Sequence, residues 1–194
     1  MVPSDFDNFF LASTGAGAAL IGLLFVAIAV APESTVMGGA PIERRAVASS
    51  AFTALINAFF VSFDALQPQT NIAWLTLAMS LFGITNSLSL GFTALRKPSS
   101  WQGAIRRIVL VLVSLVLYGF ELSNAIQLII QPNNISYVAS LSTLVLSVYG
   151  VGIIRAWELL GASRFGFFSW FNPLYDINEK GPSRTNVNKD KKMV

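Results

Sequence analysis

Five long apolar stretches alternate with short polar or charged segments along the chain, at residues 9–30, 46–66, 72–95, 105–130 and 135–160. Each is long enough to cross a bilayer, because a helix needs roughly 20 apolar residues to span about 30 Å of hydrocarbon. All eight prolines fall outside these stretches. Proline lacks a backbone N–H that a helix in lipid cannot replace cheaply. The pattern predicts an all-α, polytopic membrane helix bundle with five transmembrane helices in residues 1–161.

Two of the connecting segments are short turns that contain proline, at residues 67–70 and 131–134. We therefore expect the second and third spans, and the fourth and fifth, to form antiparallel hairpins. Both hairpins show an Arg-Arg pair, a span, a Gln-Pro turn and a second span. Equivalent residues lie 62 to 64 positions apart: Arg44 and Arg106, Gln67 and Gln131, Asn71 and Asn134. This order indicates either a parallel duplication of one hairpin or the boundary chemistry that such hairpins share.

The positive charges predict an orientation. All 13 Lys and Arg residues lie in the first and third connecting segments or at and after the end of the fifth span. Five spans place these segments on one face, and basic segments stay on the cytoplasmic face, so we expect the N-terminus outside and the C-terminus inside. The residues before the first span include Asp5 and Asp7 and no basic residue. A signal peptide instead begins with basic residues, so we expect the first span to be retained as a membrane anchor.

Composition narrows the available chemistry. The chain is 54% hydrophobic and 12% charged, whereas about a quarter of the residues in a soluble domain are charged. It contains no cysteine and no histidine, which excludes disulfides, metal sites built on these residues and histidine-based triads. We accordingly expect no catalytic residue, metal or cofactor. The net charge of +3 is not gathered into a binding motif, so we expect no nucleic acid partner.

Polar residues inside the predicted spans give the main functional signal. An ionisable residue at the centre of a span costs roughly 3 kcal/mol and usually faces protein or water. Glu121 lies a few residues past the middle of the fourth span. Ser114, Tyr118 and Asn124 lie at helical spacings from it and give that face of the helix a polar stripe.

The second and third spans add further polar groups. Asn57 and Asp64 are seven residues apart and share a helix face, and Asn86 lies in the third span. Two interpretations stay open. In the first, Glu121 carries the charge of a proton- or cation-responsive site and the asparagines supply ligands or hydrogen bonds. In the second, these groups form interhelical hydrogen bonds worth under about 2 kcal/mol each, and Asp64 is solvated near the outer surface.

The cytoplasmic end of the fifth span carries two charges of opposite sign. Arg155 and Glu158 are one helical turn apart, and we expect an interfacial ion pair with snorkelling side chains, with a gating role as the alternative. Residues 162–177 are rich in Phe and Trp, which is typical of a segment in the headgroup region. Residues 178–194 are polar and basic, which predicts a disordered cytoplasmic tail near anionic lipid.

The first span is rich in small residues. Three small-xxx-small pairs occur in it: Ser13 and Gly17, Gly15 and Ala19, Ala18 and Gly22. Such pairs predict close packing of the backbone against another helix, either in the hairpins or in a second copy of the chain.

The segments FFLASTGAGAALIGLLFVAIAVAPE and RAWELLGA resemble the first and last spans of small, uncharacterised bacterial integral membrane proteins. The resemblance implies a multi-pass protein of the bacterial plasma (inner) membrane, and it transfers no activity and no site residue. For a eukaryotic chain the alternative location is the endoplasmic reticulum membrane.

These observations favour a non-enzymatic, oligomeric channel or transporter-like unit for protons or small cations, with Glu121 at its polar centre. The alternative is an accessory or regulatory subunit of a larger membrane complex. A lipid-modifying enzyme is less favoured, because only Glu121 and Asp64 are candidate intramembrane acids and no second group completes a catalytic constellation. The expected partners are the lipid bilayer and either further copies of this chain or another membrane protein.

Overall fold

The computed structural model describes residues 2–30, 42–68, 70–96, 101–132 and 134–159, with the side chains of 42–44, 93–96, 101–107 and 158 left out. The described part is helical throughout, with no strand in it. A short 3-10 turn, η1 (Ser4–Phe6), precedes five helices: α1 (Asp7–Val30), α3 (Ile42–Ala65), α4 (Ile72–Arg96), α5 (Trp101–Ile130) and α6 (Ile135–Leu159). All belong to one compact unit, Met1–Leu160. The predicted aromatic segment, 162–177, and basic tail, 178–194, lie outside the described residues.

The helices confirm the five predicted stretches, with the largest differences at the starts of two helices. Both α3 and α5 begin four residues before the predicted span, at Ile42 and Trp101. The apolar windows inside these helices begin later, at Arg45 and Ile108. A hydropathy pattern marks where a helix becomes apolar, whereas the backbone hydrogen bonds continue through the preceding polar residues. These two helices therefore begin about one turn before the predicted spans.

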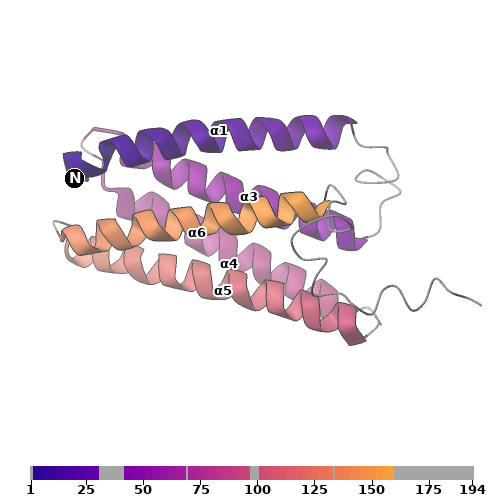
Figure 1. The fold of residues 1–194 in the computed structure, drawn as a ribbon. Helices are drawn as coiled ribbons and strands as arrows, with labels where there is room; N and C mark the ends of the chain where they lie inside the picture. The colour runs from indigo at the N-terminus through magenta and orange to yellow at the C-terminus, as the bar shows by residue number, and fades with distance from the viewer. Residues whose placement is uncertain (1, 31–41, 69, 97–100, 133, 160–194) are drawn as a thin grey trace, which may run out of the picture. The chain divides into compact units, whose positions relative to one another are not determined.

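Neighbouring helices in the chain run in opposite directions (Figure 1). Helix α3 packs against α1, α4 and α6, and α5 packs against α4 and α6. The most extensive packing joins α4 to α5 and α3 to α6, which are the pairs between the two hairpins and not within them. The four helices α3 to α6 therefore form a closed ring, and α1 lies against α3 on its outside.

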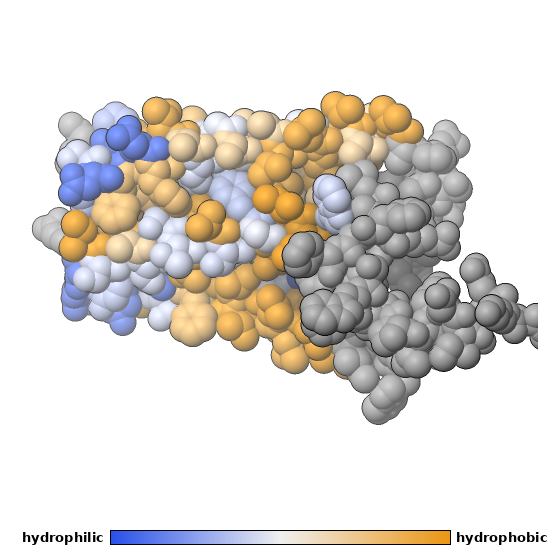
Figure 2. All heavy atoms as spheres, viewed as in Figure 1, coloured by the Kyte–Doolittle hydropathy of each residue, from blue (hydrophilic) through white to orange (hydrophobic). Residues whose placement is uncertain are grey.

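All five helices are long and apolar enough to cross a membrane. Half of the apolar window of α3 is buried inside the bundle, compared with 11% of the window of α1. Large apolar side chains such as Leu23, Phe92 and Phe120 are exposed on the outside, and Figure 2 shows such surface over the middle of the helices, with hydrophilic residues at the end that holds the N-terminus. An apolar exterior of this extent is what lipid contact requires.

Helix α1 is hydrogen-bonded to the ring around Ser13, in addition to apolar contacts such as that between the rings of Phe25 and Phe52. The hydroxyls of Ser13 and Ser62 lie 2.7 Å apart. Because the Ser62 hydroxyl donates to the Ala58 carbonyl, the Ser13 hydroxyl is the donor in this pair. The Tyr149 hydroxyl of α6 donates to the Ser13 carbonyl at 2.8 Å. Ser13 thus contacts two ring helices at once.

Gly17 allows this close approach. A Cβ atom at this position would collide with the Tyr149 hydroxyl and lie 3.2 Å from two atoms of Phe59. The buried pair of Ser13 and Gly17 is the small-xxx-small pair that packs against the hairpins. Gly15 and Gly22, by contrast, have open space where a Cβ would point.

Candidate functional site

The centre of the ring contains a carboxyl group hydrogen-bonded to an amide. The Asn57 Nδ2 of α3 donates to the Glu121 Oε2 of α5 at 3.1 Å. Both residues are 1% exposed. The second oxygen of each side chain, Glu121 Oε1 and Asn57 Oδ1, is buried and has no hydrogen-bond partner among the described residues.

The surroundings of this pair are apolar and small. On α3, Asn57 lies between the buried residues Ala54, Ala58 and Val61. The hydrogen-bond partner of the carboxyl is a neutral amide, so the charge of an ionised Glu121 is not neutralised by that contact. Burying a polar oxygen without a partner costs about 1–3 kcal/mol, and native structures keep such atoms mainly where they have a function.

A row of polar side chains leads from this pair toward the end of the bundle at which α5 begins. Tyr118 and Ser114 lie one and two turns before Glu121 on the same face of α5, and they are 4% and 3% exposed. Arg155 of α6, itself 5% exposed, donates from Nη2 to the Leu110 carbonyl at 2.9 Å and to the Ser114 hydroxyl. The row therefore runs from Arg155 through Ser114 and Tyr118 to Glu121.

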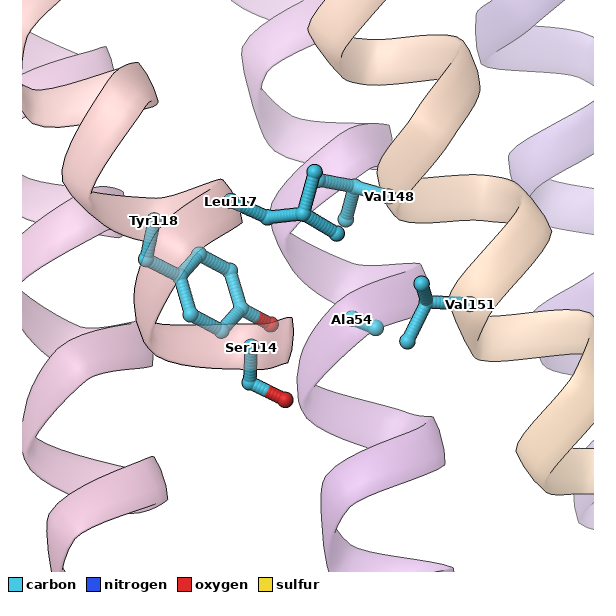
Figure 3. A pocket seen from close by; sticks show the side chains of 6 residues that line it. All are labelled: Ala54, Ser114, Leu117, Tyr118, Val148 and Val151. Carbon is cyan, nitrogen blue, oxygen red and sulfur yellow. The ribbon is translucent and has the colours of Figure 1, made fainter. Parts of the chain in front are cut away.

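A small pocket lies beside the middle of this row. It has an empty volume of about 170 Å³ with no part wide enough to hold a water molecule. Three helices line it, through Ala54 of α3, Ser114, Leu117 and Tyr118 of α5, and Val148 and Val151 of α6. Figure 3 shows the hydroxyl groups of Tyr118 and Ser114 both on the side that faces α3. On its other side the Tyr118 ring rests against Gly83 of α4, where a Cβ would lie 2.6 Å from it.

The remaining predicted site residues lie apart from this pair. Asn124 is half-buried and donates to the Phe120 carbonyl of its own helix at 2.9 Å. Asn86 of α4 donates to Thr53 Oγ1 of α3 at 2.9 Å, one turn before Asn57. Each side chain thus donates to a group other than the Glu121 carboxyl.

Two charged residues of the prediction lie at opposite ends of the bundle. Asp64, at the end of α3, is 8% exposed, so it is more buried than its place near the outer surface suggested, and its Oδ2 has no hydrogen-bond partner among the described residues. Arg155 turns toward α5. The side chain of Glu158 lies outside the described residues, so the pair of Arg155 and Glu158 stays a prediction.

Sequence reasoning did not single out Ser62, Thr53 and Tyr149, although each makes an interhelical hydrogen bond. All three belong to the predicted spans, so their polarity inside an apolar stretch was a signal. Periodicity gives the face of a helix on which a residue lies, but not which residue of another helix meets it.

The described residues contain no group of three or more His, Cys, Asp or Glu side chains placed to hold a metal ion. No family model matches the chain, and no curated protein or solved structure shows significant similarity to it. The functional argument therefore depends on the chemistry of the polar row, which offers one carboxyl, one amide, two hydroxyls and one guanidinium.

Proposed function

We propose that this multi-pass membrane protein is a transporter-like unit that binds a proton or a small cation at Glu121, acting as an oligomer. The observation that supports this most is the hydrogen-bonded pair of Glu121 and Asn57 in the centre of the ring, in which one oxygen of each side chain has no hydrogen-bond partner among the described residues. An intramembrane carboxyl group is costly, and such residues are found mainly on ion pathways and proton relays.

The packing around the pair favours binding coupled to movement over a fixed pore. The pocket beside Tyr118 is too narrow for water, and the two inner residues are 1% exposed. An ion or proton would therefore reach Glu121 only when the helices separate, or along a route opened by contact between copies of the chain.

The test is ion flux into proteoliposomes loaded with a pH-sensitive or a sodium-sensitive dye. Glu121→Gln preserves the size and the hydrogen bond of the carboxyl but cannot ionise, and we expect it to reduce flux at least tenfold. Thr143→Ala is the control, because Thr143 is exposed and bonds only to its own helix. If the wild-type protein gives no flux, or if Glu121→Gln equals the wild type, the proposal is wrong.

We also propose that the hairpins α3–α4 and α5–α6 arose by parallel duplication. Asn57 and Glu121 are 64 positions apart, within the 62 to 64 that separates the repeated features. If the two hairpins are duplicates, Asn57 and Glu121 occupy equivalent positions in them. Equivalent residues touch each other only next to the two-fold axis that relates the two halves, so this pair would lie beside an axis normal to the membrane. The extensive packing of α4 on α5 and of α6 on α3 is equivalent under the same rotation. We further propose that the protein lies in the bacterial inner membrane with its N-terminus outside.

An accessory role in a larger complex is the second candidate, favoured by the outer face of α1. Gly15, Ala19 and Gly22 share this exposed face, and a Cβ at either glycine would meet nothing within 4 Å. Small residues of this kind suit a neighbouring helix. Native mass spectrometry after extraction in a mild detergent distinguishes the two functions: a different protein in fixed ratio supports the accessory role, and a defined homo-oligomer counts against it.

A further inference from the structure

We propose that Glu121 is reached from one face of the membrane only, from the end of the bundle at which α6 finishes, along Ser114 and Tyr118, and that the Arg155 side chain closes this route. This inference rests on the proposed role of Glu121 as the binding residue. It adds the direction of access and the residue that controls it.

One row of polar groups extends from Glu121 to a charged residue. Tyr118, Ser114 and Arg155 follow one another toward the end at which α5 begins, and all three are at most 5% exposed. Hydroxyl groups one helical turn apart on the same face lie close enough for a water molecule or a proton to pass between them once the helices loosen. The pocket of about 170 Å³ lies beside this part of the row, so the packing there is incomplete.

The opposite direction is closely packed. On α5, Ala125 and Leu128 continue the face of Glu121 and are 0% and 2% exposed. On α3, Val61 follows Asn57 on that side and is 0% exposed.

This half of the bundle also contains buried hydroxyl groups, from Ser62 of α3 and from Thr76 and Ser80 of α4, and all three residues are 0% exposed. Each of these hydroxyls donates to a carbonyl of its own helix. A proton or ion at Glu121 thus meets closely packed side chains on that side.

Arg155 is the residue that has to move for the route to open. Its guanidinium bridges α6 and α5 through the Leu110 carbonyl and the Ser114 hydroxyl. It lies near the end of a span, where long basic side chains commonly extend toward the surface, so a change of rotamer can carry the guanidinium out of the bundle. That movement would free Ser114 and uncover the pocket.

The charge of Arg155 indicates which species uses the route. A guanidinium at a constriction repels metal cations. A proton can instead move along Ser114 and Tyr118, because each hydroxyl accepts a proton on its oxygen and releases its own to the next acceptor, with Glu121 as the last. We therefore assign the proton, and not sodium or potassium, as the species that reaches Glu121.

Single cysteines test the direction of access, since the chain contains no cysteine of its own. Ala54→Cys lies in the pocket, and Ala125→Cys lies beyond Glu121; both positions are alanines that are at most 1% exposed. Each variant is reconstituted in vesicles and treated from either side with a small, anionic, membrane-impermeant methanethiosulfonate. Trp157→Cys and Gln131→Cys, exposed at opposite ends, identify the two sides.

We expect Ala54→Cys to react only from the side at which Trp157→Cys reacts, and Ala125→Cys to react from neither. Arg155→Leu should raise the labelling rate of Ala54→Cys at least tenfold without affecting Ala125→Cys, and Arg155→Lys, which keeps a shorter cation, provides the same comparison if the leucine variant does not fold. Faster labelling of Ala125→Cys, equal labelling of Ala54→Cys from both sides, or no effect of either Arg155 variant would overturn the proposal. Labelling needs no transport, so a failed flux assay with this labelling pattern would refute the proposed function alone.

Discussion

The Tyr149 hydroxyl donates to the backbone carbonyl of Ser13 at 2.8 Å, joining residues 136 positions apart. The Ser13 side chain at the same time contacts Ser62. Together with the apolar packing of α1 on α3, which includes the contact between the rings of Phe25 and Phe52, these polar contacts fix the position of α1.

We expect Tyr149→Phe to lower the free energy of unfolding by about 0.5–1.5 kcal/mol, because the ring stays while its hydrogen bond is lost. Unfolding in mixed micelles, followed by circular dichroism, measures this change. Tyr137→Phe on the same helix is the control, since Tyr137 is less buried than Tyr149. Equal free energies of unfolding for Tyr149→Phe and the wild type would show that the hydrogen bond from Tyr149 to Ser13 does not stabilise the fold.

Replacing the buried glycine of α1 should have a larger effect than replacing an exposed one. Gly17→Ala places a methyl group against Tyr149 and Phe59, and we expect a loss of about 1–3 kcal/mol from overpacking. Gly15→Ala enters open space and should be neutral or slightly stabilising, because alanine favours the helix. The same unfolding measurement compares them, and a loss in Gly15→Ala as large as in Gly17→Ala would contradict the packing described here.

The central pair predicts a difference between two asparagines. Asn57→Ala removes the partner of Glu121 inside the ring, and we expect it to cost about 1–3 kcal/mol because a buried oxygen loses its donor. Asn124→Ala removes a bond within one helix and should change stability by less than about 0.5 kcal/mol. A reversed order of the two losses would mean that Asn57 and Glu121 are not paired in the membrane.

The proposed orientation is tested with single cysteines outside the hydrocarbon. Gln67→Cys and Gln131→Cys, in the two short turns, should react in intact cells with a membrane-impermeant maleimide. Arg45→Cys, exposed near the start of α3, should react only after the cells are opened, because basic residues stay inside. Labelling of Arg45→Cys in intact cells would reverse the orientation.

The sequence predicted the existence and number of the helices, because about 20 apolar residues in lipid leave the backbone no other structure. It predicted the shared face of Ser114, Tyr118 and Glu121 from the helical period. Asn124 was assigned to the same polar stripe of α5. It lies about 120° around the helix from Tyr118, at the edge of the buried face.

The partner of Glu121 could not be predicted in this way. Asn57 and Asn86 were equal candidates in the sequence, and the choice depends on how α3 and α4 are rotated and shifted relative to α5. In the structure, Asn86 meets Thr53, and Asn57 meets Glu121. The rotation and shift of each helix depend on the packing of all the side chains together, and no periodic pattern in the sequence specifies them.

The extensive packing of α3 on α6 has a consequence for synthesis. Helix α3 is made well before its main partner, α6. Until α6 inserts, Ala54 and Leu55 of α3 lack the helix against which they pack, so the newborn chain spends part of its synthesis with an incomplete interior. Chains that end before α6 should be recognised as unfinished by membrane proteases, which makes the insertion of α6 a check on assembly before the protein is used.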